Sequence, residues 1–184
     1  MRDDTLQKCY TIPGWAWPTE LGWLYDTAAQ SRSHLEIGTY CGKSLLATAC
    51  GLPRGSSITV VENDCEVATI GTEWIQAVRA ATFRVIQQDT GIVVRHLPLA
   101  SLTAAIQCQR EGLLFDSIYI DACHEFAECK ADIQAWLPML RPGGVIAGHD
   151  YWTPNIGVME AVNELFPDRF TVCPGTRIWS HRKP

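Results

Sequence analysis

Short apolar segments alternate with segments of helical periodicity along most of this chain, and this alternation limits the folds that it can adopt. Five segments are short and apolar, which predicts buried strands: 33–37, 57–61, 83–87, 115–120 and 145–147. The segments between them favour helices: 43–50, 66–81, 97–110 and 126–137. Strands that are separated by helices pair in parallel, and the helices cover both faces of the sheet. The pattern therefore predicts an α/β fold.

The two ends of the chain complete this expected fold. Residues 1–17 predict an irregular lead-in, and residues 18–30 predict a helix. Near the other end, residues 156–166 predict a last helix, and 169–172 with 177–179 predict a closing hairpin. We expect a Rossmann-like, doubly wound, mostly parallel seven-stranded sheet, with helices on both faces and a C-terminal antiparallel hairpin.

Length, charge and cysteine spacing limit the class of protein. The 184 residues fit one domain over 1–184, with a lead-in and helix over 1–32 and a Rossmann-like core over 33–184. The formal net charge is -5, and the sequence has no basic stripe of the kind that nucleic-acid binders carry. No segment approaches the roughly 18 apolar residues of a membrane span, so we expect a soluble, cytoplasmic protein. The eight cysteines have irregular spacings, which favours reduced thiols over disulfides or zinc.

The first predicted strand leads into a loop with two glycines. The sequence of residues 36–44 is Glu-Ile-Gly-Thr-Tyr-Cys-Gly-Lys-Ser. Glycine allows a tight turn and a close approach of the backbone to a ligand, and the following helix offers free N–H groups. A dinucleotide fingerprint would need glycine at position 40, which is Tyr40. A phosphate-binding P-loop would need one more residue before Lys43. An acidic residue before a G-x-x-x-G turn, as in nucleoside–methionine binding loops, fits Glu36 and Gly38 without adjustment.

Acidic residues close the next two predicted strands. Glu62, which is followed by Asn63, ends the second strand, where a carboxylate can accept both hydroxyls of a ribose. Asp89, which is followed by Thr90, ends the third predicted strand and could accept a hydrogen bond from an adenine amino group. Both acids also suit ordinary strand ends and turns, since Asp is a common turn residue.

The fourth and fifth predicted strands end in Asp121 and in His149-Asp150. Adjacent parallel strands would bring these three side chains to one rim, where they suit a divalent cation such as Mg²⁺. The alternative is that Asp121 caps the next helix and that the other two hydrogen-bond the backbone. His124 is a candidate general base, or else a packing residue in the first turn of a helix.

With these motifs in order, the chain resembles the class I S-adenosylmethionine-dependent methyltransferases, in the group of macrocin O-methyltransferase and the cephalosporin-hydroxylase-like proteins. The resemblance spans about 14–179 and is strongest in three stretches: 35–44, 119–126 and 130–151. It implies that the glycine loop wraps the methionine moiety of the cofactor through these residues: Gly38, Thr39, Tyr40, Gly42 and Ser44. It further implies that Glu62 holds the ribose, that Asp89 and Thr90 edge the adenine, and that Asp121, His149 and Asp150 hold Mg²⁺ or another divalent metal. His149 departs from the acidic residue of the macrocin-type enzymes.

The expected activity is methyl transfer from S-adenosylmethionine to a small-molecule acceptor, first of all to a hydroxyl oxygen. Asp121, His124 and His149 are the candidate catalytic residues. Without a metal, His124 or His149 would take the proton, and the sequence would then favour a nitrogen acceptor as much as an oxygen acceptor. Trp15, Trp17 and Trp152 could roof the acceptor pocket or simply pack.

Three other interpretations stay open at this point. They are a non-catalytic S-adenosylmethionine-binding domain, a P-loop-like nucleotide-binding protein, and a metal-dependent hydroxylase with iron at His149. A homodimer is left open as an assembly, and no nucleic acid or membrane is expected as a partner.

Overall fold

The computed structural model describes residues 2–64 and 71–184, which form a sheet of seven strands in the order β3-β2-β1-β4-β5-β7-β6. Five strands run parallel: β1 (Ser33–Ile37), β2 (Ser57–Val61), β3 (Val94–Leu97), β4 (Phe115–Ile120) and β5 (Leu140–Gly148). Two run antiparallel: β7 (Trp179–Arg182), which pairs with β5, and β6 (Thr171–Val172), which pairs with β7. The expected sheet and its closing hairpin are confirmed.

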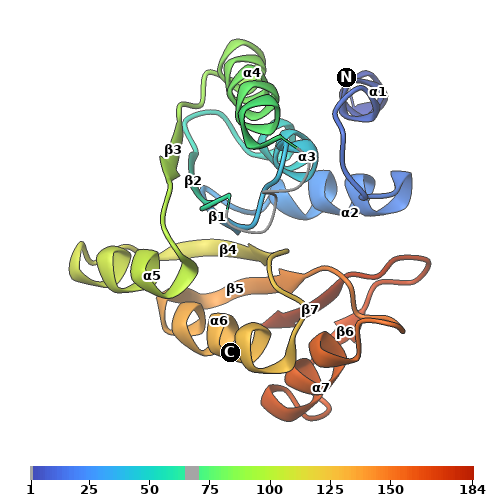
Figure 1. The fold of residues 1–184 in the computed structure, drawn as a ribbon, viewed down its shortest axis with the longest axis vertical. Helices are drawn as coiled ribbons and strands as arrows, with labels where there is room; N and C mark the ends of the chain where they lie inside the picture. Colours follow the sequence, from blue (N-terminus) through green and yellow to red (C-terminus); the bar gives the residue numbers. More distant parts are fainter. Residues whose placement is uncertain (1, 65–70) are drawn as a thin grey trace.

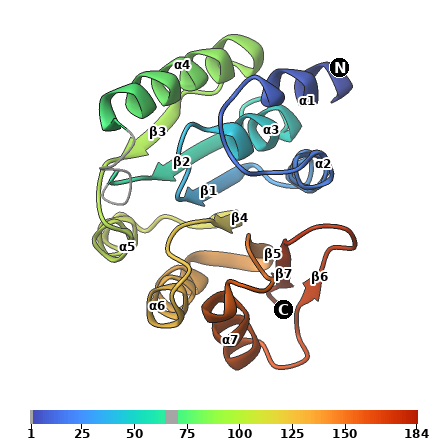
Figure 2. The ribbon, with the colours of Figure 1, turned by 45° about the vertical axis from the view of Figure 1, so that its right-hand side comes forward.

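Helices cover both faces of this sheet (Figures 1 and 2). One layer consists of four helices: α1 (Arg2–Tyr10), α2 (Pro18–Ala28), α3 (Lys43–Gly51) and α4 (Thr72–Thr90). The other consists of α5 (Ser101–Arg110), α6 (Phe126–Trp136) and α7 (Ile156–Leu165), with the short 3₁₀ helix η1 (Leu137–Met139) after α6. In the described part of the chain, no helix is both long and apolar enough to span a membrane.

Each central strand contributes to two hydrophobic cores because successive side chains point to opposite faces. Leu35 and Ile37 of β1 pack with the core under α5–α7. Ile58 and Val60 of β2 pack with the core under α1–α4, together with Tyr119 of β4. Burial on both faces explains why the sequence of these strands is almost continuously apolar.

Two sequence-based predictions of secondary structure are wrong. Residues 83–87 are not a strand but lie within α4, whose buried residues Ile75, Arg79, Thr82 and Ile86 follow helical spacing. The third strand comes later, at β3, which contains Arg95 and is mostly half-buried, so it lacks a clear apolar signal. The lead-in also contains a helix, α1, whose face with Leu6 and Cys9 is buried. The expected helix over 66–81 begins partly outside the described residues, and the described α4 starts at Thr72.

The seven cysteines in the described residues are all free, as expected; Cys65 lies outside the described residues.

The strand order reverses between β1 and β4, and ligands of open α/β sheets bind at the carboxyl ends of strands beside such a point. Backbone hydrogen bonds fix the residues that follow these strands at one edge. Gly38 N–H donates to Val61 O at 2.9 Å, Asp121 N–H donates to Ile37 O at 2.8 Å, and His149 N–H donates to Ile120 O at 3.1 Å. The fold therefore brings the residues singled out after β1, β2, β4 and β5 to one edge of the sheet.

Candidate active site

The glycine loop after β1 is a tight turn that needs its glycines. Gly38 has φ +76°, and a Cβ on it would lie 2.0 Å from the carbonyl oxygen of Asp121. Gly42 has φ +88° and precedes the first residue of α3. Tyr40 between them also has a positive φ of 49°. The first glycine thus lets the loop pack directly on the segment after β4, and the second turns the chain into α3.

Glu62, at the end of β2, is bound to this loop. Its Oε2 accepts hydrogen bonds from Thr39 N–H at 3.1 Å and from Tyr40 N–H at 2.9 Å. Its Oε1 accepts from Asp64 N–H at 3.0 Å, and the exposed Asn63 lies between these two acids. Hydrogen bonds therefore join Glu62, which the sequence analysis assigned to a ribose, to the loop that it assigned to a methionine moiety.

Arg79 of α4 holds the same loop from the side, and sequence patterns alone did not reveal it. Its side chain is buried, and it donates to Asp64 Oδ1 at 2.6 Å and to Tyr40 O at 3.1 Å. Its Nη1 also lies 3.7 Å from Glu62 Oε2. This buried cation offsets the two acids of the loop.

Glu36 and Ser44 lie behind the loop. Ser44 Oγ donates to Glu36 Oε1 at 3.0 Å, whereas the buried Glu36 Oε2 has no hydrogen-bond partner in the part of the chain that the structure describes. Lys43 does not extend into a phosphate site, because its Nζ donates to Gly14 O at 3.0 Å. This contact, with the short loop, argues against a P-loop.

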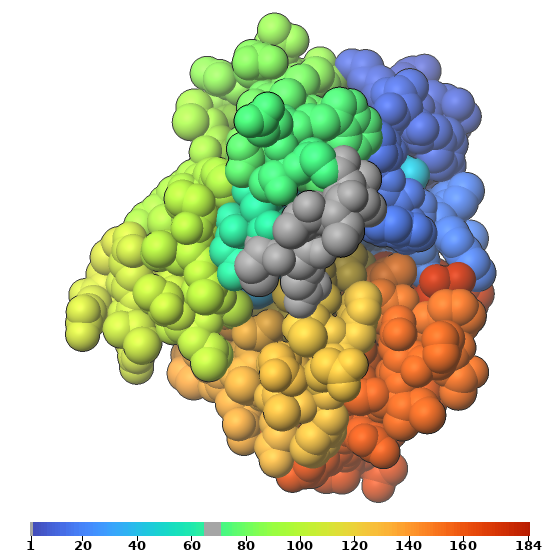
Figure 3. All heavy atoms as spheres, viewed as in Figure 1, coloured from blue at the N-terminus to red at the C-terminus, as the bar shows by residue number. Residues whose placement is uncertain are grey.

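Asp89 and Thr90 are not at the end of a strand, which corrects the sequence-based prediction. They form the last turn of α4, just before β3 begins, and so lie at the opposite edge of the sheet from Glu62. Asp89 accepts from Lys8 Nζ at 2.6 Å and so joins α4 to α1, which Figure 3 shows side by side. Thr90 Oγ1 donates to Ile86 O at 2.7 Å. Both residues stabilise helices and lie far from the glycine loop.

Two carboxylates and an imidazole meet at the rim after β4 and β5. Asp121, His124 and Asp150 each offer one ligand atom, and these atoms lie within 4.8 Å of one another. His124 Nε2 lies 3.0 Å from Asp150 Oδ2, and the His124 side chain is 45% exposed. Burial raises the pKa of Asp121 to about 6. The pKa of Asp150 is lowered: burial opposes the shift, but the bonds from His124 and His149 prevail.

His149 lies beside this group of three ligand atoms rather than in it, which differs from the metal set expected from the sequence, and its Nδ1 is 3.9 Å from Asp121 Oδ1. Its Nδ1 faces Asp150 Oδ2 at 3.2 Å, and its Nε2 faces Glu20 Oε2 at 3.1 Å. Burial lowers the pKa of His149, but the nearby carboxylates of Asp150 and Glu20 outweigh burial and raise the pKa to about 10. A doubly protonated ring presents no lone pair to a metal or a proton. His124 takes the place that the sequence gave to His149.

Glu20 is the partner that the sequence did not predict. It comes from α2, where its Oε2 also accepts from Trp17 N–H at 2.7 Å, and its side chain is fully buried. Its Oε1 accepts from Arg177 N–H at 3.0 Å. A Glu near a helix start normally suggests only a capping box, so no pattern distinguished this role.

Exposed aromatic rings surround the same edge. Trp15 packs on Tyr40 of the glycine loop with ring centroids 5.2 Å apart. Trp152, after β5, donates from Nε1 to Asp150 Oδ1 at 3.0 Å. Trp17 and Trp152 both lie against the guanidinium of Arg177. All three tryptophans of the sequence analysis therefore lie near the candidate site.

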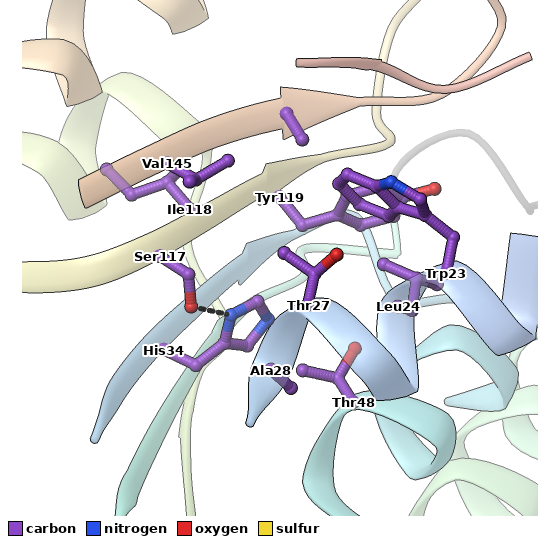
Figure 4. Close-up of a pocket in the computed structure, with 11 residues that line it drawn as sticks. Trp23, Leu24, Thr27, Ala28, His34, Thr48, Ser117, Ile118, Tyr119 and Val145 are labelled. Carbon is purple, nitrogen blue, oxygen red and sulfur yellow. Dashed lines mark hydrogen bonds between the residues drawn. The ribbon is translucent and has the colours of Figure 1, made fainter. Parts of the chain in front are cut away.

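The cavity in Figure 4 lies elsewhere, on the α2 face of the sheet between β1, β4 and β5. Its lining is mostly apolar, and the sequence-predicted site residues do not line it. His34 and Ser117 face each other there at 2.8 Å, as the dashed line shows. The cavity belongs to the core, and the chemistry gathers at the strand ends.

Comparison with known proteins identifies relatives over most of the chain. A family described as methyltransferase domain matches residues 35–151. Catechol O-methyltransferase domain-containing protein 1 of Mus musculus is 30% identical over 119 residues, which cover 64% of this chain and 41% of that protein. Caffeoyl-CoA O-methyltransferase of Populus kitakamiensis is 24% identical over 150 residues, which cover 80% of this chain and 60% of that protein. The chain thus matches less than two thirds of the length of either.

Solved structures share the fold. An O-methyltransferase from Bacillus cereus in complex with SAH has a TM-score of 0.68 at 22% identity, with 99% of this chain and 90% of that chain covered. The O-methyltransferase TomG from Streptomyces achromogenes, in complex with SAM, has a TM-score of 0.69 at 18% identity, with 98% and 90% covered. The Rossmann-like architecture expected from the sequence is therefore that of known methyltransferases.

Proposed function

The chain belongs to the methyltransferase domain family, and on that basis we propose that it transfers a methyl group from S-adenosylmethionine to a hydroxyl oxygen of a small-molecule acceptor. The observation that carries the proposal is the attachment of Glu62 to the glycine loop through Thr39 and Tyr40. A carboxylate at the end of the second strand, which can accept the hydroxyls of a ribose, thus lies beside a glycine loop that suits a methionine moiety. The relatives, a catechol O-methyltransferase domain-containing protein and a caffeoyl-CoA O-methyltransferase, support the choice of a hydroxyl acceptor.

The proposed cofactor site consists of the loop and the acids around it. Backbone groups of the loop line the methionine end: Gly38, Thr39, Tyr40 and Gly42. Behind them, the buried Glu36 Oε2 lacks a hydrogen-bond partner among the described residues, with His34 Nε2 3.9 Å away, and an ammonium group would satisfy it. Ser44 orients Glu36, and Glu62 with Asn63 lies at the ribose end. Asp121 closes the site beneath Gly38.

The adenine end is assigned to a different segment from the one that the sequence suggested. Glu62 N–H donates to Leu97 O at 3.2 Å, so the chain after β3 lies next to the ribose acid. We assign residues 98–100 to the edge of the adenine, because they follow the true third strand.

The rim beside this site suits the deprotonation of a hydroxyl. The donor set of Asp121, His124 and Asp150 fits a divalent cation, since Mg²⁺ and Mn²⁺ prefer carboxylates and Mn²⁺ also accepts imidazole. Such a cation would make a bound hydroxyl more acidic. Without a cation, His124 would be the proton acceptor instead, because Asp150 holds its Nε2 and orients the ring.

Binding of the product analogue S-adenosylhomocysteine tests the proposed site. We expect Glu62→Ala to weaken this binding by roughly 1.5–3 kcal/mol, because a hydrogen bond to a charged group is lost. Isothermal titration calorimetry measures the affinity, and Glu160→Ala, which removes an exposed acid of α7, is the matched control. ATP binding without S-adenosylhomocysteine binding would instead favour a nucleotide-binding protein. Cofactor binding without methyl transfer to any phenolic or amine acceptor would indicate a non-catalytic domain.

The role of a metal is tested separately. Asp150→Asn should leave S-adenosylhomocysteine affinity within about threefold but reduce turnover by roughly 10²–10⁴-fold, the range for loss of a positioned acid–base group. A chelator should reduce wild-type turnover, and Mn²⁺ should restore it and raise the melting temperature of the wild type but not of Asp150→Asn. Full turnover in chelator would refute the metal and leave His124 as the proton acceptor.

A further inference from the structure

One charged group at the candidate site has no role in the function proposed above. Arg177 precedes β7 and lies between two indoles, with its guanidinium carbon 4.1 Å from the ring centroid of Trp17 and 3.6 Å from that of Trp152. These residues come from the start of α2, from the turn after β5 and from the loop before β7, so only the fold brings them together.

The backbone of Arg177 is fixed at the same place. Its N–H donates to Glu20 Oε1 at 3.0 Å, and its carbonyl accepts from Tyr151 N–H at 2.9 Å. The side chain is only 17% exposed. The guanidinium is therefore held before any ligand arrives, which lowers the entropic cost of binding.

The guanidinium carbon of Arg177 lies over both indole rings, and the hydrogen-bond donors of its nitrogens are available to a ligand. Indole rings lie over the guanidinium, whereas its five N–H groups point outward in its own plane. Within the described residues, the guanidinium donates no hydrogen bond. Its nearest carboxylate atom, Asp150 Oδ1, is 3.9 Å away and already accepts from Trp152 Nε1. A planar oxyanion could therefore bind in the plane of the guanidinium through two parallel hydrogen bonds.

Arg177 also lies next to the groups that would act on the acceptor. Asp150 contacts Arg177 through one oxygen and His124 through the other. A molecule with a carboxylate at Arg177 would therefore reach the rim with a hydroxyl on the same small ring system. Trp17 and Trp152 are 47% and 38% exposed, so they offer aromatic surface to such a ring.

We propose that Arg177 binds a carboxylate of the methyl acceptor, so that the acceptor is an aromatic hydroxy acid rather than a neutral phenol. This proposal rests on the proposed methyl transfer. It adds a specificity-determining residue from outside the matched segment 35–151. Glu20 positions both Arg177 and His149, and so links the acceptor's anion site to the rim.

Two probes that differ only in the carboxylate test the proposal. The protein is first saturated with S-adenosylhomocysteine, and 3,4-dihydroxybenzoate or catechol is then titrated by calorimetry. We expect 3,4-dihydroxybenzoate to bind at least about tenfold more tightly than catechol, as charge-assisted bidentate pairs are strong. Arg177→Gln should abolish this difference by weakening the binding of 3,4-dihydroxybenzoate, and S-adenosylhomocysteine should still bind. Arg169→Gln, which removes an exposed positive charge nearby in the sequence, should preserve the preference.

The other outcomes separate this proposal from the proposed function. Failure to bind S-adenosylhomocysteine would refute the methyltransferase site itself. Binding of that ligand with no preference for the carboxylate, or with neither probe bound, would refute the role of Arg177 alone. An equal loss for both probes in Arg177→Gln would assign Arg177 a structural role. Arg177→Lys keeps the charge but not the planar donors, so full preference in that variant would contradict the bidentate geometry.

Discussion

Replacement of His149 by alanine is expected to destabilise the protein by about 3–5 kcal/mol, because it leaves a buried carboxylate without its counter-charge. Glu20 is fully buried and lies 3.1 Å from His149 Nε2, and Asp150 lies 3.2 Å from Nδ1. Urea denaturation, with an unchanged dependence on denaturant, would measure the loss in the free energy of unfolding. The result would also show that the histidine in the rim motif is there for structure.

The pH dependence of this loss has a defined sign. The pKa of His149 in the folded protein is about 10, above its ordinary value of 6.5. The imidazolium therefore contributes its full stability below about pH 6.5, and this contribution is lost as the pH rises through 10. The difference between wild type and His149→Ala should shrink between pH 7 and pH 10.

A double-mutant cycle with Glu20→Gln identifies the pair as the cause. If the buried charge is responsible, Glu20→Gln combined with His149→Ala should cost less than the sum of the two single changes. Strict additivity, with a loss that does not depend on pH, would contradict the ion pair.

Replacement of Gly38 by alanine is expected to cost about 2–5 kcal/mol and to abolish binding of S-adenosylhomocysteine. The added Cβ would lie 2.0 Å from Asp121 O, so the loop and the segment after β4 would have to separate. This overpacking adds to about 1–2 kcal/mol for a left-handed non-glycine residue. Thermal and urea denaturation measure the first effect, and calorimetry measures the second.

Gly55 is the matched control for Gly38. It has a similar φ of +80°, but no atom of the described residues lies within 4 Å of its added Cβ. Gly55→Ala should therefore cost only the backbone term and leave ligand binding intact. Equal losses for the two glycines would mean that the close approach at Gly38 contributes nothing.

The sequence predicted the central strands well because their burial is simple. The predicted strands 33–37, 57–61 and 115–120 coincide with β1, β2 and β4, which are covered on both faces and so carry continuous apolar runs. The third strand was predicted in the wrong segment. Phe83, Val85 and Ile86 read as a strand, but a short apolar run inside an amphipathic helix has the same appearance.

That error in one strand displaced part of the predicted site. Because Asp89 and Thr90 were assigned to a strand end, they were expected beside the cofactor, whereas they close α4 at the other edge. Glu62 and the glycine loop lie in contact, as expected, since they follow strands whose ends were predicted correctly.

The sequence by itself determined the order of strands and helices, the glycine loop and the acids that follow the parallel strands, because these depend on local pattern and on the rule that parallel strands end at one edge. Only the tertiary structure decided which histidine faces the rim. His149 and His124 are both near strand ends, but Glu20 of α2 engages the first and leaves the second beside Asp150. The place of Arg177 between Trp17 and Trp152 likewise depends on contacts among distant segments, which sequence spacing does not encode.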